Sequence, residues 1–169
     1  MVHIRGQDFT KKELDFFIEN YNTKLFNCHE TNLDEVYKRF PTYRKMFVLE
    51  LNFDDAIRNH IEPNKLGGFC IDLSHFYSSK LRGTLEYKYV ISRIHNTKFL
   101  ANHLNGFSHV HKKDLHLLNN KHELDFILDV PKIIFGKYIA LELENTIEKQ
   151  LEFKDYVIKL LKKKNLDVR

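Results

Sequence analysis

Short apolar runs that end in a polar or titratable side chain recur along the chain. In the clearest one, at residues 67–72, two glycines lead into an apolar run that closes on Asp72, and His75 follows three residues later. A continuous apolar run of this length is typical of a buried strand in a parallel sheet. The pattern therefore predicts a strand that delivers Asp72 and His75 to a polar site at its carboxyl end.

Segments with helical spacing separate these runs. After Thr10, which can cap a helix with Glu13 in the capping-box position, Leu14, Phe17 and Ile18 lie on one helical face. By the same criteria residues 1–4 form a first strand or a frayed end, and further strands are expected at 24–29, 45–52, 67–72, 99–104 and 138–142. Helical segments are expected at 33–40, 54–60, 84–95, 124–128 and 147–161, and a long loop at 109–120.

The alternation of strand and helix predicts the fold class. It repeats about six times without a linker rich in Pro, Gly or Ser, which indicates one α/β domain, residues 1–169, built on a parallel sheet. In such folds the chemistry lies at the carboxyl ends of the strands. Those ends carry metal-type side chains, namely His3, His29, Glu50, Asp72 with His75, His103 and Glu142.

Each of these residues alone favours a structural interpretation, because a strand-end Glu is usually a surface carboxylate and a His is more often hydrogen-bonded than a ligand. Their recurrence at successive strand ends favours a metal site. Glu50 and Glu142 lie in runs too apolar for surface strands, and a buried carboxylate is costly unless it is paired or metal-bound. Glu144 shares the strand parity of Glu142, which is preferred because it directly follows the apolar residues 138–141.

Asp114 and His116 form a D-x-H pair in the expected loop. Such a pair is common by chance, but this loop is long enough to fold back over the site after the strand that ends at His103. The nearby His109, His111 and His122 are interpreted as exposed loop histidines.

Composition narrows the function classes. The net charge of +4 and pI near 8.9 permit an anionic ligand without requiring one. Two cysteines in apolar runs, with no signal-like or membrane-spanning run, predict reduced core thiols in a soluble cytoplasmic protein without membrane contact. There is no Gly-rich phosphate loop and no G-x-S-x-G motif. Cys28 cannot act with His29 because neighbours on a strand point to opposite faces.

These motifs resemble the xylose isomerase-like TIM barrels, which include the endonuclease IV family of AP endonucleases and many sugar-phosphate isomerases and epimerases. The resemblance covers most of the chain. Residues 69–75 are similar to the sixth-strand D-x-x-H motif, 48–50 to the fifth-strand glutamate, 26–29 to the fourth-strand histidine, 139–142 to the eighth-strand glutamate and 114–116 to the D-x-H of the endonucleases. His103-Leu104-Asn105 resembles H-L-N-D, with Gly106 in place of the aspartate, and His3 resembles the third-strand histidine at one position only.

The endonuclease branch implies a trinuclear zinc site and phosphodiester hydrolysis by a metal-held hydroxide, with abasic DNA as substrate and a role in DNA repair. Glu50 would bridge two metals and, with Glu142, serve in catalysis. The resemblance implies three ligand groups: Glu50 with His29, with or without His3; Glu50 with Asp72, His103 and Glu142; and His75, Asp114 and His116.

The isomerase branch implies one Mn or Mg ion on Glu50, Asp72, His103 and Glu142, with the two glutamates moving a proton on a small sugar phosphate. An AP endonuclease also needs basic, wedge-like loops to open a duplex, and the sequence indicates none.

Length is the main departure from the family. Family barrels have eight strands, and this chain matches from about the third, so we expect a truncated TIM-barrel-like array of about six βα units. Its raw sheet edges predict a homo-oligomer, a smaller closed barrel or a completing partner chain. A third interpretation is a degenerate, non-catalytic barrel that serves as a binding or assembly subunit.

Overall fold

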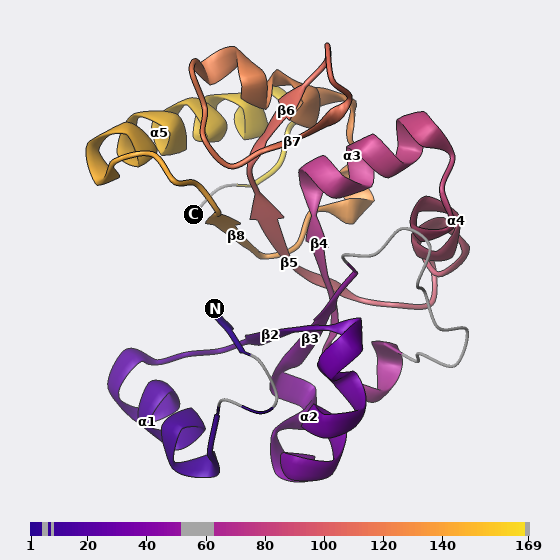
Figure 1. Ribbon diagram of the computed structural model, residues 1–169, viewed down its shortest axis with the longest axis vertical. Helices are drawn as coiled ribbons and strands as arrows, with labels where there is room; N and C mark the ends of the chain where they lie inside the picture. Colours follow the sequence, from indigo (N-terminus) through magenta and orange to yellow (C-terminus); the bar gives the residue numbers. More distant parts are fainter. Residues whose placement is uncertain (5–6, 8, 52–62, 168–169) are drawn as a thin grey trace.

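A computed structural model describes residues 1–4, 7, 9–51 and 63–167. Six parallel strands form one sheet in the order β1-β2-β3-β4-β5-β8, curled into a half-barrel (Figure 1). The strands are β1 (Val2–His3), β2 (Phe26–His29), β3 (Phe47–Glu50), β4 (Gly68–Asp72), β5 (Phe99–Leu104) and β8 (Tyr138–Leu141). The predicted α/β class and parallel sheet are confirmed, and the half-barrel is compatible with a truncated TIM-barrel-like arrangement.

The helices lie along the outside of the curled sheet. They are α1 (Lys11–Tyr21), α2 (Leu33–Arg39), α3 (Leu73–Arg82), α4 (Leu85–Ser92) and α5 (Ile147–Lys163), with a long 3-10 helix at Lys121–Asp129. The predicted capping box is present, because the Thr10 side chain accepts from the Glu13 N–H and the Glu13 carboxylate accepts from the Thr10 N–H. Short 3-10 helices occur at Glu30–Asn32, Pro41–Met46, Pro63–Lys65 and Lys132–Ile134. No described helix is both long and apolar enough to cross a bilayer.

Alternation along the strands separates two apolar layers. The larger layer, which includes Cys28, lies between the sheet and the helices. A small cluster of Leu25, Val48, Cys70 and Ala101 lies apart from it, on the strand face that also carries Glu50. Both cysteines are free and buried, as expected, and Cys28 and His29 point to opposite faces.

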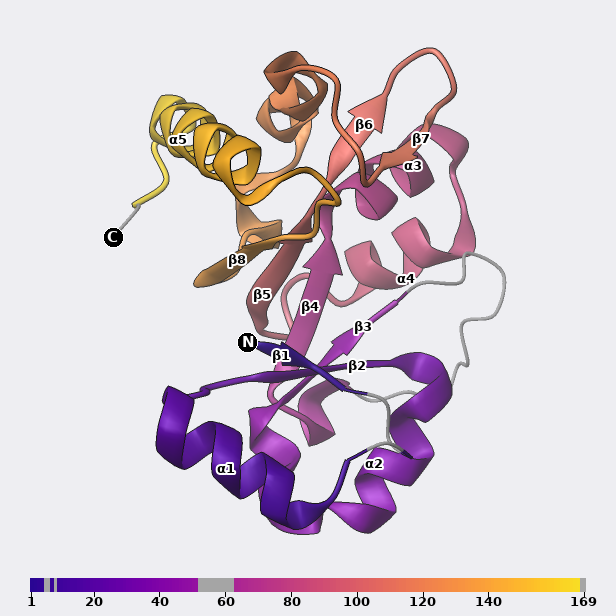
Figure 2. The same cartoon turned by 60° about the vertical axis from the view of Figure 1, so that its left-hand side comes forward.

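The curl brings β1, one edge strand of the sheet, towards β4 and β5 on the concave side (Figure 2). Met1 Sδ lies 3.9 Å from Cys70 Sγ on β4, and the His3 and His103 rings lie 5.8 Å apart although β1 and β5 are not neighbours in the sheet. The polar carboxyl ends of the strands therefore face one another across a short distance.

The two glycines before the central strand serve close packing. A Cβ on Gly68, whose φ is +146°, would lie 2.2 Å from the Lys98 carbonyl oxygen, and a Cβ on Gly67 would lie 2.6 Å from that of Lys45. The neighbouring backbones can approach β4 so closely only because no side chain intervenes.

The structure corrects three sequence-based expectations. The expected loop at 109–120 contains β7 (Lys113–Leu115), which forms an antiparallel hairpin with β6 (Gly106–Ser108). Its strands are too short and polar to show alternation. Helix α3 was not expected, and the strand expected at 45–52 begins only at Phe47, because residues 45 and 46 end a 3-10 helix. The helical turn expected at 54–60 lies outside the described residues.

Candidate metal centre

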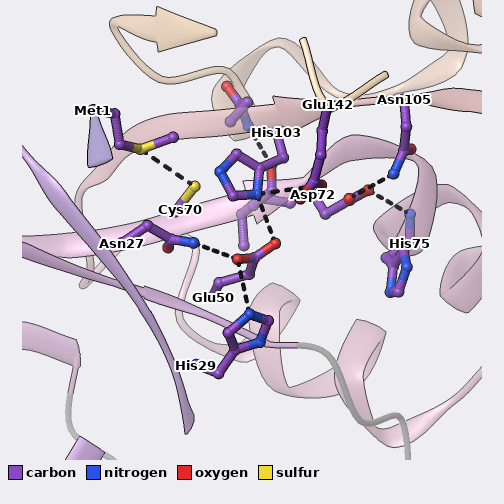
Figure 3. Close-up of polar contacts among 12 residues, drawn as sticks. Met1, Asn27, His29, Glu50, Cys70, Asp72, His75, His103, Asn105 and Glu142 are labelled. Atoms are coloured by element: carbon purple, nitrogen blue, oxygen red, sulfur yellow. Dashed lines mark hydrogen bonds and ion pairs between the residues drawn. The ribbon is translucent and has the colours of Figure 1, made fainter. Parts of the chain in front are cut away.

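Glu50, at the end of β3, is the centre of the site (Figure 3). Its side chain is only 2% exposed, and Oε1 accepts a 2.8 Å hydrogen bond from His103 Nδ1. Oε2 accepts from Asn27 Nδ2, and His29 Nε2 lies 3.7 Å from the same oxygen. The parallel register places His29 beside Glu50, so two adjacent strand ends deliver these groups together.

Two donor sets share Glu50. His3, Glu50 and His103 offer ligand atoms within 4.8 Å of one another, and so do Glu50, Asp72 and Glu142. The two sets meet again at His103, whose Nδ1 lies 3.6 Å from Glu142 Oε2. His3, the weakest match in the sequence, thus belongs to the first set and stacks on His29 at 4.5 Å.

Asp72 is oriented by the helix that follows it. One carboxylate oxygen accepts from the backbone N–H groups of Ser74 and His75 at 2.9 Å each, which makes Asp72 the N-cap of α3. The other oxygen accepts from Asn105 Nδ2 at 3.0 Å. The Ser74 hydroxyl lies 2.8 Å from the capping oxygen and also contacts Asn105. The D-x-x-H motif is therefore both a strand end and a helix start.

A third group lies beside α3. Asp114 Oδ2 lies 3.7 Å from His75 Nε2 and 3.3 Å from His116 Nε2. His116 is fixed from its other side, because Nδ1–H donates to the Glu142 carbonyl oxygen at 3.2 Å. Asp114 reaches this place because the β6–β7 hairpin folds back onto α3.

The sequence-predicted site residues are thus brought together, in two neighbouring groups. The first group is the Glu50 carboxylate with the four side chains around it, namely His29, Asp72, His103 and Glu142. The second is the third ligand group, namely His75, Asp114 and His116. Glu144 is exposed and contributes its backbone N–H to the His116 carbonyl oxygen at 2.8 Å.

Sequence reasoning missed the supporting polar residues Asn27 and Ser74. Asn27 lies two residues before His29, hence on the same strand face, so parity could have identified it. Ser74 lies in the first turn of α3, which was not expected.

The surroundings of the site shift the pKa values of Glu50 and Glu142 in opposite directions. Burial alone would raise the pKa of Glu50, but the hydrogen bond and charge of His103 outweigh it and hold that pKa at about 2. Burial likewise raises the pKa of Glu142, and the nearby Glu50 and Asp72 carboxylates add to this, although His103 opposes them. His75 in the third group behaves differently. Burial lowers the pKa of His75, but Asp114 raises it to about 9, while the hydrogen bond to His75 holds that of Asp114 at about 2.

The residues fit a bound divalent cation. The carboxylates of Glu50, Asp72 and Glu142 converge within 4.8 Å, and among the described residues only histidines form ion pairs with Glu50 and Glu142. Imidazole nitrogens and carboxylate oxygens are the ligands of zinc and manganese sites. Cys70 belongs to neither donor set: it lies in the small apolar cluster, and burial raises its thiol pKa well above the usual value.

Comparisons of the chain with protein-family models, curated proteins and solved structures found no match. The assignment of a function therefore depends on the geometry of the site and on the motifs that the sequence carries. The resemblance to xylose isomerase-like barrels stays a prediction.

Proposed function

We propose that this chain is a divalent-metal-dependent phosphoesterase that hydrolyses a phosphodiester in the manner of endonuclease IV-type AP endonucleases. The observation that carries the proposal is the pair of donor sets that share Glu50, with a third histidine–carboxylate group beside them. An isomerase needs only one such set, and the third group would then have no role.

The donor chemistry favours zinc. His3, His29 and His103 surround Glu50, and His75 and His116 flank Asp114, so imidazole nitrogen is abundant in both groups. Imidazole suits zinc better than magnesium, which prefers oxygen ligands. When bound, divalent cations would polarise the phosphoryl group and lower the pKa of a coordinated water.

The protein's own residues supply orientation and a proton acceptor. Glu50 is held charged and fixed from three sides, so it would offer a preorganised carboxylate to bound cations. Glu142 is 40% exposed and therefore reaches the open side of the site. Because partial burial, together with the neighbouring carboxylates, raises its pKa, its Oε2 atom can take up a proton from an attacking water.

Metal content and strand cleavage test the proposal together. Protein purified without chelators should contain about two to three zinc equivalents and should cleave a duplex with one abasic site. Glu142→Gln should lose metal and activity. Glu144→Gln, a carboxylate of the same strand parity that is exposed, is the matched control. A chain that takes up no metal even after soaking would contradict the proposal and favour a non-catalytic barrel.

The runner-up is a sugar or sugar-phosphate isomerase or epimerase. Glu50, Asp72, His103 and Glu142 form a complete Glu-Asp-His-Glu set by themselves, which is the observation in its favour. It would be supported by about one equivalent of manganese or magnesium and by activity on a small sugar phosphate.

We also propose that the chain self-associates in a cytoplasmic setting. Among the described strands, β1 and β8 each pair on one side only, and such edges are usually covered. Sedimentation of the purified protein should show a species larger than one chain, and a monomer at all concentrations would contradict this.

A further inference from the structure

The tip of the β6–β7 hairpin is a fixed structure beside the third ligand group. Ser108 Oγ accepts from the His111 N–H at 3.2 Å, and Lys112 adopts a left-handed conformation with φ of 52°. The Ser78 hydroxyl on α3 donates to the Lys112 carbonyl oxygen at 2.9 Å. The tip is therefore hydrogen-bonded both to β6 and to α3, the helix that Asp72 caps.

A hollow of about 350 Å³ lies between α3 and this tip. Helix α3 lines it with His75, Ser78 and Arg82, and the hairpin lines it with residues 111–114. Its volume is within the range of small-ligand pockets, roughly 300–1,000 Å³. The third ligand group thus opens directly into a space lined by cationic side chains.

The two lysines at the hairpin tip are exposed and carry unbalanced charge among the described residues. In the part of the chain that the structure describes, no carboxylate forms an ion pair with the exposed ammonium groups of Lys112 or Lys113. The one acidic lining residue, Asp114, already faces His75 and His116. An anion in the hollow would therefore meet the lysine ammonium groups of the tip beside the third ligand group.

Val110 adds an exposed apolar side chain to the same hairpin turn. It lies in the hairpin turn, and its side chain is 85% exposed, the most exposed of the large hydrophobic side chains that the structure describes. An exposed apolar side chain among cationic ones suits a nucleic-acid strand, which offers phosphates together with apolar faces of sugars and bases.

We propose that the hollow between α3 and the β6–β7 hairpin binds a phosphate group of a nucleic-acid strand, next to the phosphodiester that the metal centre cleaves, with Val110 against the adjoining sugar or base. This inference rests on the proposed phosphodiesterase function. It assigns Lys112 and Lys113 to positioning the polynucleotide and supplies the basic, wedge-like element that the sequence did not reveal.

Salt-dependent binding of a short labelled DNA duplex without an abasic site tests the inference on metal-loaded protein. In the double variant Lys112→Asn/Lys113→Gln, asparagine tolerates the left-handed backbone at the first position. Its affinity should fall about tenfold, and the slope of log affinity against log salt should decrease by roughly 2, one unit for each lost phosphate contact. Val110→Ser should weaken binding with the slope unchanged. Lys162→Gln/Lys163→Gln, with the same charge change on α5, should keep the wild-type slope.

The outcomes separate this inference from the proposed function. If abasic DNA is cleaved but the hairpin double variant matches the α5 control in affinity and slope, the inference is overturned and the function stands. If no substrate is cleaved but duplex binding is lost in the hairpin variants alone, the inference is supported and the function falls. If the hairpin double variant loses binding to anionic phospholipid vesicles but keeps duplex binding, the surface is a lipid site and the proposal is overturned.

Discussion

His103 Nδ1 lies 2.8 Å from Glu50 Oε1, so the carboxyl ends of two strands separated by β4 are joined by one hydrogen bond. That bond fixes the His103 ring with its other nitrogen directed away from Glu50. It also keeps the buried carboxylate charged, with a pKa of about 2. The pair is the fixed point about which the other donors are arranged.

Removal of the Glu50 charge should therefore disable the whole centre. Glu50→Gln keeps the size of the side chain but removes the carboxylate that both donor sets share, so bound metal should fall to the content of the third group or to none. Metal analysis and strand cleavage check this. Retention of the full wild-type metal content in Glu50→Gln would refute the shared-ligand arrangement.

The third ligand group distinguishes hydrolase from isomerase. Asp114→Ala and His116→Ala should each remove about one metal equivalent and lower phosphodiester cleavage by at least roughly 100-fold, because a cation that stabilises the transition state would be lost. His122→Ala, which changes an exposed histidine on the nearby 3-10 helix, is the control. An isomerase activity that survives both substitutions would favour the runner-up function.

The metal-free protein should lose stability in alkaline solution. The folded-state pKa of His75 is raised to about 9 from the usual 6.5, so its protonated form stabilises the fold fully below pH 6.5. This contribution, about 1–3 kcal/mol, is lost as the pH rises through 9. Thermal unfolding in chelator between pH 6 and pH 9.5 measures it. The variant His75→Gln should show a flatter profile over that window, and an equal slope in both proteins would exclude His75 as the cause.

Metal binding should be linked to protons in the same group. A cation on His75 Nε2 displaces the proton that Asp114 stabilises, so binding releases protons below pH 9 and weakens as the pH falls. The rise in melting temperature that zinc produces should therefore be larger at pH 8 than at pH 6. Calorimetric titration in buffers with different ionisation enthalpies gives the number of protons released. Zero protons would contradict a ligand role for His75.

The glycine at the start of the central strand should tolerate no side chain. Gly68→Ala places a Cβ 2.2 Å from the Lys98 carbonyl oxygen at a φ of +146°, and should cost about 2–4 kcal/mol of unfolding free energy. Gly83→Ala is the matched control, because Gly83 also has a positive φ of +67° but has no atom within 4 Å of the added Cβ. It should cost only about 1 kcal/mol. Equal losses in chemical denaturation would show that the close approach has no energetic weight.

The parts of the site that the sequence revealed are those on long apolar strands. Glu50, Asp72 and His103 follow runs whose burial is evident from composition alone, and parallel topology then places their ends together. His3 gave only a weak signal because a two-residue strand shows no periodicity. Its position depends on the pairing of β1 with β2, which is a tertiary contact that local sequence patterns do not reveal.

The elements that the sequence did not reveal have patterns that local reasoning cannot separate from loops. Helix α3 buries three serines (Ser74, Ser78 and Ser79) together with its apolar residues, so its inner face shows no clear apolar stripe in the sequence. The β6–β7 hairpin has three-residue strands and a turn without Gly or Pro, and its pairing becomes favourable only against α3.

The curl of the sheet has a consequence for how the chain folds. His3 comes from one edge strand and Glu142 follows the other, yet both reach the carboxylate of Glu50. Ligands so distant in sequence can gather only after the intervening elements have assembled, and such long-range closure is slow. Cations bound there would connect the first and last strands of the sheet. Their binding free energy would then count as folding free energy, and the chain would mature in step with the supply of metal.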